Sequence, residues 1–489
     1  MVNQKACILT SSDAFETGLA GLMNWYLRIL GVNTHSTTSL DQYDEEDILI
    51  VTKGSANFQI LKQEDHSAIE KIHTSKDVNI VLLGEAARRL GICRRFVGTT
   101  TLKWQRIIAP IEVRPCGNLV EKWQSYVSGI GDGLVAPIKI NNNTKSLVQT
   151  NNFTVAAYNG NITYIGVHPR DLTQPLYHSY ALPFVCLILK NLVEKLSNIR
   201  SLSDSVPFNI HIDDHPCTTE RLDKGHRCLP PSWYQRLGDL IEQYNMKNAI
   251  TFFIVPTRVV MNGFHHHKVT WPSRTLNAIL DERGVCWEVG IHGLTHISDW
   301  SNLRLFANYT LDKLLPKSIL RTFPYYWYFY REFWDPLLRR EPSLDEIEKR
   351  LKAIKKILNN EYDPLFAAPG YHAGQRTLEA LIEENFRVVV TDRVNSSMSH
   401  LSGVTGDFVR SNTIKEGKTC PIAVQRLVSA SENTAVFYNL VKAKLPIVID
   451  AHVFDLSDIE RLFRLANKLK IKPLSTIDLA FRYKEIMNK

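Results

Sequence analysis

The second half of the chain contains a series of short apolar runs that are separated, for the most part, by segments of helical periodicity. Such alternation of strands and helices predicts a (β/α) barrel or an open α/β sheet with a core of parallel strands. The interval 298–345 does not fit the repeat, so we expect an insertion there. The runs are Phe208–Ile212, Ala249–Val255, Cys286–Ile291, Leu365–Ala368, Arg387–Thr391 and Ile447–Asp450.

The first half has a different pattern. Residues 5–92 alternate apolar runs with helical segments, which predicts a βαβαβ unit and a parallel sheet. From about 105 to 168 the chain is richer in β-branched and aromatic residues, and Asn159-Gly160 between two such runs predicts a hairpin. The mostly polar stretch Ser197–Ser205 predicts a boundary. We therefore expect one α/β domain over 1–200 and a second over 206–489.

Composition excludes several classes of function. The net charge of +8 is small for 489 residues, so we expect no nucleic-acid partner. The longest apolar run, Ala181–Leu189, is far shorter than the roughly 20 residues that cross a bilayer, and no secretory signal opens the chain. We expect a cytoplasmic protein without a membrane span. Its eight cysteines are widely spaced, so Cys217, Cys228 and the rest are expected to be reduced thiols.

Histidines and acids follow several of the predicted strands directly. Asp213-Asp214 follows the first run of the second half, His292 and His296 follow the third, and His452 follows the last. Pro369-Gly370-Tyr371 follows the fourth. Active sites of parallel α/β folds are built at this carboxyl edge of the sheet, where loops and helix N-termini converge. We expect these side chains to form one site.

The spacing of these residues suits a metal. Two histidines separated by three residues can face the same way, and a carboxylate from a neighbouring strand supplies a third ligand while leaving a position open for water. Asp214, His292 and His296 would be that triad. One carboxylate and two imidazoles favour a divalent metal, with Zn²⁺ first among the candidates.

In order and spacing these motifs resemble the polysaccharide deacetylase family, the metal-dependent carbohydrate N- and O-deacetylases with a distorted (β/α) barrel. The resemblance covers residues 206–489. It implies a substrate with acetamido groups. The matching motifs are Asp213-Asp214-His215-Pro216, His292 with His296, Pro369-Gly370-Tyr371, and the apolar run that ends in His452.

Two departures from the family pattern stand out. His215 occupies the position after the Asp pair where the family usually has Gly. The Arg that normally precedes the Pro of the third motif is also missing, because Phe366-Ala367-Ala368 fills that stretch. Arg393 could supply the missing charge, and Asp392 could be the acid that tunes the catalytic histidine.

The chemistry of amide hydrolysis assigns a role to each residue. Asp213 would accept the proton of the attacking water, and His452 would protonate the departing nitrogen. The oxyanion would lie between the metal and a backbone N–H, that of Tyr371. Two alternatives stay open: a metal-dependent amidase for a small non-sugar amide, and a glycan-binding protein that kept the fold and lost turnover.

Two regions outside these motifs also carry expectations. Phe323–Trp334 concentrates nine aromatic residues inside the insertion, which suits either a sugar-stacking surface or a buried anchor. The first 200 residues resemble the flavodoxin-like fold of glutamine amidotransferase domains, with Gly84-Glu85 where those enzymes bend around a cysteine. Because no Cys is there, we expect a non-catalytic domain.

Overall fold

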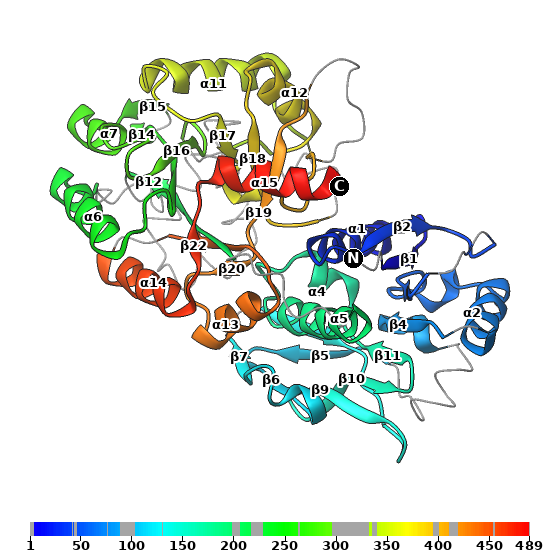
Figure 1. The fold of residues 1–489 in the computed structure, drawn as a ribbon. Helices are drawn as coiled ribbons and strands as arrows, with labels where there is room; N and C mark the ends of the chain where they lie inside the picture. Colours follow the sequence, from blue (N-terminus) through cyan, green and yellow to red (C-terminus); the bar gives the residue numbers. More distant parts are fainter. Residues whose placement is uncertain are drawn as a thin grey trace.

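The computed structural model contains two large sheets, each with its own helices (Figure 1). It describes residues 4–41, 43, 46–75, 77–88, 103–129, 131–197, 206–216, 228–262, 265–295, 332–334, 340–394, 401–409, 419–452 and 455–488. In this part of the chain, no helix has the length and apolar character that crossing a bilayer requires.

The first sheet combines a parallel half with an antiparallel extension, in the order β2-β1-β3-β4-β11-β10-β9-β6-β7. Pairing is parallel from β2 to β11 and antiparallel from β11 to β7. The strands are β1 (Lys5–Leu9), β2 (Asn33–Thr37), β3 (Ile48–Val51), β4 (Asn79–Leu83), β6 (Ile111–Pro115), β7 (Tyr126–Ser128), β9 (Lys145–Thr150), β10 (Phe153–Asn159) and β11 (Ile162–Ile165). The short strands β5 (Gln105–Ile108) and β8 (Asp132–Val135) pair separately.

The expected hairpin and parallel unit are both present. β10 and β11 are antiparallel around Asn159 and Gly160, as the Asn-Gly signal predicts. The polar edge strand β2 was not expected, because its sequence Asn-Thr-His-Ser-Thr has no apolar alternation. The helices of this half are α1 (Ala14–Ile29), α2 (Gln63–Ser75), α4 (Pro169–Thr173) and α5 (Leu182–Ser197).

The second sheet is a parallel half-barrel with the order β19-β18-β17-β16-β13-β12-β21-β20. Its strands are β12 (Pro207–His215), β13 (Ile250–Ile254), β16 (Glu288–Ile291), β17 (Leu365–Ala367), β18 (Val388–Thr391), β19 (Ile422–Gln425), β20 (Val428–Ser429) and β21 (Ile447–Ala451), and β22 (Lys472–Pro473) pairs with β12. The two ends of this order, β19 and β20, are joined in the chain by only Arg426 and Leu427.

Helices and a hairpin surround this half-barrel. The helices are α6 (Pro231–Tyr244), α7 (Ser273–Leu280), α11 (Leu344–Ile357), α12 (Gln375–Glu383), α13 (Thr434–Lys442), α14 (Leu456–Leu469) and α15 (Thr476–Asn488). β14 (Thr257–Asn262) and β15 (His265–Thr270) form an antiparallel hairpin that the sequence pattern did not predict. The six predicted runs all correspond to strands, whereas β19 and β20 were missed.

The larger of two buried apolar cores in the described residues includes residues of both sheets and the helices between them, and the smaller belongs to the first half alone. In α1, the Trp25 indole donates to the carbonyl of Thr405 at 2.8 Å, and the Tyr26 hydroxyl donates to the carbonyl of Ala443 at 2.6 Å. In Figure 1, α1, α4 and α5 lie toward the half-barrel, and α5 contacts α13. The two halves are therefore packed closely together. Of the expected boundary Ser197–Ser205, only Ser197, the last residue of α5, is described.

Two other expectations are only partly covered by the described residues. In the aromatic insertion, Phe333 is fully buried against Phe366, with ring centroids 5.4 Å apart, which is the behaviour of an anchor; residues 323–331 are not described. The expectation of reduced thiols is confirmed for Cys7, Cys116, Cys186, Cys286 and Cys420, which are free. It is wrong for Cys228, which is disulfide-bonded to a cysteine outside the described residues. An oxidised pair is typical of oxidising compartments.

Candidate functional site

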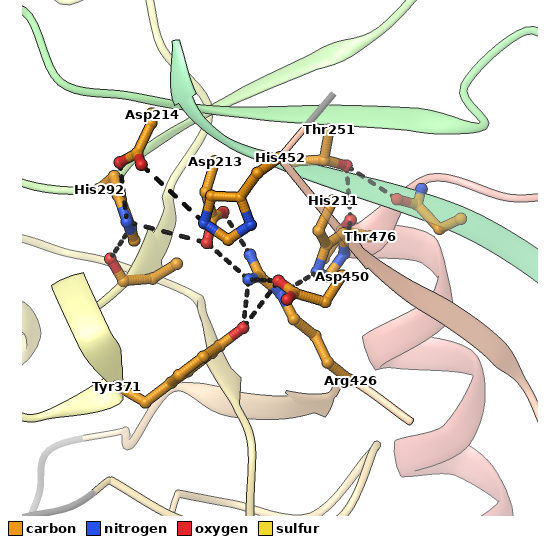
Figure 2. Close-up of polar contacts among 12 residues, drawn as sticks. His211, Asp213, Asp214, Thr251, His292, Tyr371, Arg426, Asp450, His452 and Thr476 are labelled. Atoms are coloured by element: carbon orange, nitrogen blue, oxygen red, sulfur yellow. Dashed lines mark hydrogen bonds and ion pairs between the residues drawn. The ribbon is translucent and has the colours of Figure 1, made fainter. Parts of the chain in front are cut away.

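The end of β12 brings two neighbouring carboxylates to one side of the strand. Pairing with β13 is regular through Ile212 and then shifts, so that His215 lies opposite Ile254 with one extra residue between. At this bulge Asp214 has a φ of 64°, in the left-handed region. A bulge re-aims side chains that would otherwise alternate. Asp213 and Asp214 consequently both face the site, as Figure 2 shows.

His215, which replaces the family's glycine, belongs to the core. Its side chain is fully buried, and its Nδ1 lies 3.1 Å from the hydroxyl of Tyr234. The imidazole ring packs against Phe252 at a centroid distance of 4.7 Å. Histidine in place of glycine at position 215 therefore affects the packing of the core beneath the bulge. The carboxylates of Asp213 and Asp214 still face the site.

Arg426 is the central residue of the site, and the sequence motifs did not indicate it. Its fully buried guanidinium donates from Nη1 and Nη2 to the two oxygens of Asp213, at 2.6 and 2.5 Å. Nη1 also donates to Asp450 and to the hydroxyl of Tyr371, both at 2.5 Å (Figure 2). A planar guanidinium fits a carboxylate in this two-bond geometry, whereas an ammonium group does not.

The ion pair determines the charge of Asp213. Burial alone would raise the pKa of this carboxyl, but the Arg426 guanidinium holds it well below its usual range. The pKa of Arg426 is correspondingly raised despite its burial. Asp213 is therefore ionised at every pH near neutrality, with its orientation fixed by two hydrogen bonds.

Arg393 and Asp392 are paired with each other at the end of β18. Arg393 donates to Asp392 from Nε and Nη2, at 2.9 and 2.7 Å. The guanidinium that faces Asp213 is thus that of Arg426, from the connection between β19 and β20. This corrects the expectation that Arg393 supplies the missing charge.

Tyr371 joins the site through its side chain. Gly370 and Tyr371 both have left-handed backbone, with φ of 58° and 57°. The Tyr371 hydroxyl donates to Asp450 Oδ1 at 2.8 Å, whereas its backbone N–H donates to the carbonyl of Ala368 at 2.8 Å. That N–H is engaged in the turn after β17, which argues against the expected role as an oxyanion donor.

The expected metal ligands are partly brought together. The Nδ1 of His292 lies 2.8 Å from the carbonyl of Ala367, so Nδ1 carries a proton and Nε2 is the nitrogen that could bind a metal. Nε2 lies 3.7 Å from Asp214 Oδ1. A histidine held in this way by a carbonyl is typical of metal ligands. Asp214 and His292 fit a divalent metal in donor type and orientation.

The third expected ligand, His296, lies outside the described residues. Among the residues that are described, no group of three or more His, Cys, Asp or Glu side chains is arranged to hold a metal ion. The two described members of the triad, Asp214 and His292, are therefore compatible with a metal and do not by themselves complete its site.

His452, directly after β21, lies beside the carboxylates of the site. Its Nε2 lies 3.9 Å from Asp214 Oδ2, and its side chain is 54% exposed. Desolvation would lower the pKa of this imidazole, but the carboxylates of Asp450, Asp214 and Asp213 together raise it above its ordinary value. The arrangement favours a protonated His452 beside an ionised Asp213.

From Arg426, a chain of buried polar groups leads through His211 to Thr476 and Thr251 (Figure 2). Arg426 Nε donates to His211 Nδ1 at 3.2 Å, and His211 Nε2 lies 3.0 Å from the Thr476 hydroxyl. The Thr251 hydroxyl is 2.6 Å from that of Thr476 and donates to Glu288 at 3.0 Å. Glu288 also accepts the backbone N–H of Thr476, at the start of α15, at 2.6 Å.

Glu288 predicts a pH-dependent stability. Burial raises its pKa from 4.5 to about 7. Because the folded state then holds the proton more tightly than the unfolded state, the stabilisation is complete below pH 4.5 and is lost as pH rises to 7, by about 3 kcal/mol. Glu288→Gln has no carboxyl group to titrate at this position. The thermal midpoint of the variant minus that of wild type should therefore increase between pH 4.5 and pH 8. The exposed control Glu361→Gln should show no such trend, and a wild-type slope retained in Glu288→Gln would contradict the assignment.

The loop after His292 is held by a buried acid of the insertion. Glu332 is fully buried and accepts the backbone N–H of Thr295 at 3.0 Å. Arg350 pairs with its other oxygen at 3.3 Å. A Cβ on Gly293 would collide with the Glu332 carboxylate, so glycine is required at this position. Glu332 therefore fixes the backbone between the two histidines of the motif.

We expect Glu332→Gln to destabilise the protein by about 1–3 kcal/mol, because the buried Arg350 loses the charge of one carboxylate partner and keeps the more exposed Glu346. The change should appear as a lower thermal midpoint. Glu348→Gln is the matched control on α11, since Glu348 pairs with the exposed Lys352, and exposed pairs contribute little. Equal midpoints for both variants would refute the anchoring role.

Comparisons with known proteins add no function. The sequence matches no family in a scan of known protein families and no curated protein. Among solved structures, a protein assigned to the polysaccharide deacetylases, from Mycobacterium smegmatis, is 12% identical, covers 58% of this chain and 93% of its own, and has a TM-score of 0.30. A glutamine amidotransferase is 11% identical, with 38% and 98% coverage and a TM-score of 0.27.

A ThuA-like protein from Bacteroides uniformis is 14% identical, covers 34% of this chain and 83% of its own, and has a TM-score of 0.26. Likenesses this distant carry no argument about chemistry. What is established is a mixed α/β protein with a parallel half-barrel and a large sheet of flavodoxin-like type, whose distant structural neighbours include a deacetylase and an amidotransferase.

Proposed function

We propose that this protein is a metal-dependent hydrolase that removes acetyl groups from an N-acetylated amino sugar or polysaccharide. The observation that carries the proposal is the Arg426–Asp213 pair, which holds an ionised carboxylate 3.8 Å from the Nε2 of His292. Asp214 and His452 flank the same position. The hydrolytic chemistry is supported by this arrangement, and the acetylated sugar by the resemblance of the motifs to polysaccharide deacetylases.

In this proposal a divalent metal, zinc first among the candidates, is held by Asp214, His292 and His296. When bound, such a metal lowers the pKa of a coordinated water and polarises the acyl carbonyl. Other residues of the chain orient these ligands. The carbonyl of Ala367 fixes the tautomer of His292, and Glu332 fixes the loop that leads to His296.

The two proton transfers are assigned to groups with opposite charge states. Asp213 is kept ionised by Arg426 and accepts the proton of the attacking water. His452 is kept protonated by the surrounding carboxylates and donates a proton to the leaving nitrogen. Two groups whose environments move their pKa values apart are suited to a base and an acid at the same pH.

The deciding experiment measures acetate release by the zinc-loaded protein from N-acetylglucosamine, its oligomers and a set of small non-sugar acetamides. We expect release from the sugars, and release about 10²–10⁴-fold slower from the Asp213→Asn variant under the same conditions. Release from the small amides alone would favour the amidase alternative. Binding of the oligomers without any release would favour the glycan-binding alternative.

A further inference from the structure

Polar side chains occupy one level of the half-barrel across four neighbouring strands. His211 of β12 is paired in register with Asp450 of β21 on one side and with Thr251 of β13 on the other. Thr251 is in turn paired with Glu288 of β16. We call these four residues the polar row. Strands of a covered parallel sheet are usually apolar throughout, because a buried polar group without a hydrogen bond is destabilising. The members of the row therefore need partners, and His211 and Asp450 both accept hydrogen bonds from Arg426.

The contacts of His211 determine where its ring carries a proton (Figure 2). An arginine Nε–H can only donate, so the Nδ1 of His211, 3.2 Å from the Nε of Arg426, accepts and carries no proton. The proton is on Nε2, which donates to the hydroxyl of Thr476 at 3.0 Å. Burial, and next the charge of Arg426, lower the pKa of His211 well below its usual range, so the ring is neutral. His211 is therefore a fixed acceptor for the guanidinium.

With His211 in place, all three nitrogens of the Arg426 guanidinium are hydrogen-bonded. Nη1 and Nη2 donate to the two oxygens of Asp213, and Nε donates to His211. The guanidinium carbon also lies over the rings of Phe253 and Tyr371, 5.4 and 5.3 Å from their centroids. Contact with an aromatic face attracts the cation and restrains it out of its plane. The hydrogen bonds, including the one to His211, restrain it within the plane.

We propose that His211 is a positioning residue, which holds Arg426 in the orientation that presents Asp213 to the attacking water. This rests on the proposed function, in which Asp213 is the base. His211 and Asp213 are two residues apart on β12, so their side chains leave the strand on the same face. One strand therefore supplies both the base and the residue that holds the arginine of the base. Because His211 acts through Arg426, its loss should lower the rate of the chemical step and leave substrate binding unchanged.

The test measures kcat and KM for acetate release from an N-acetylglucosamine tetramer by the full zinc-loaded chain, with rates expressed per bound zinc. His211→Leu removes the acceptor and keeps apolar volume. We expect its kcat to fall by about ten- to a hundredfold, as a small misplacement of a reacting group does, with KM unchanged. His211→Asn places an amide oxygen where Nδ1 was, and should retain most of the wild-type kcat although it loses the contact with Thr476.

Thr251→Val is the matched control within the polar row. Thr251 is fully buried, like His211, and its hydroxyl bonds Thr476 and Glu288 at 2.6 and 3.0 Å. We expect this variant to have a lower thermal midpoint and a kcat near that of wild type. A second readout needs no activity: in protein labelled with ¹⁵N-arginine, the Nε–H signal that is lost in Arg426→Lys should exchange with solvent faster in His211→Leu than in wild type or His211→Asn.

The outcomes separate this inference from the proposed function. A wild-type kcat in His211→Leu, or an equal loss in His211→Leu and His211→Asn, would overturn the inference alone. A wild-type protein that releases no acetate would overturn the proposed function and the positioning role with it, whatever the exchange rates. If His211→Leu fails to fold, His211→Met, which is apolar and more flexible, replaces it, and we expect the same loss of kcat.

Discussion

Replacing Arg426 by methionine should slow acetate release by orders of magnitude and destabilise the fold. The guanidinium is fully buried and forms ion pairs with both Asp213 and Asp450. Its removal leaves two carboxylates without their cation, and breaking a buried pair in this way costs about 3–5 kcal/mol. Asp213 would also lose the two hydrogen bonds that orient it, so we expect acetate release to fall by about 10²–10⁴-fold, the usual contribution of a general base.

Two further variants make the Arg426 prediction specific. Arg426→Lys keeps a positive charge and loses the two-bond geometry, so it should retain more stability than Arg426→Met and remain impaired in rate. Arg393→Met removes the nearby paired arginine, whose partner is Asp392. It should destabilise the fold while leaving the rate of the folded protein near that of wild type. A rate lost in Arg393→Met and kept in Arg426→Met would reverse the two assignments.

Arg426 was missed because the strand before it was missed. β19 has only the apolar residues Ile422–Val424 before Gln425, too short a run to separate from a loop by periodicity. The position of Arg426 in the sequence could have indicated its role. An arginine directly after an apolar run of a parallel repeat lies at the carboxyl edge of the sheet. Sequence reasoning looked for the charge near the third motif, where Asp392-Arg393 was the nearest candidate. Charge and spacing alone could not distinguish the two arginines.

The strand-end residues were predictable for a different reason. In a parallel sheet every carboxyl end lies on one edge, so Asp213, His292 and His452 had to approach one another once the strands were recognised. The detailed contacts were not predictable in the same way. The engagement of the Tyr371 N–H depends on a left-handed turn at two residues, and the Glu332 contact depends on where the insertion folds back.

The largest contrast we expect is between the neighbours Asp213 and Asp214. Asp213 is bound by Arg426 through both oxygens, whereas Asp214 faces His292 and His452 at 3.7 and 3.9 Å. Asp213→Asn keeps its size and can no longer accept a proton as a carboxylate. It should therefore keep the metal in the loaded protein and lose about 10²–10⁴-fold in rate. In this variant the buried Arg426 loses one of its charge partners, so we also expect a lower thermal midpoint.

Asp214→Asn should behave differently, because it replaces an anionic ligand by a weaker neutral one. We expect this variant to lose zinc and activity together. It should lose less thermal stability in the metal-free state, since Asp214 faces His292 and His452 at 3.7 and 3.9 Å, whereas Asp213 lies 2.5 Å from Arg426. Metal content by elemental analysis, read beside the rates, distinguishes the two. Zinc lost from Asp213→Asn and retained in Asp214→Asn would mean that the bulge presents base and ligand in the opposite order, with Arg426 then orienting a ligand and not a base.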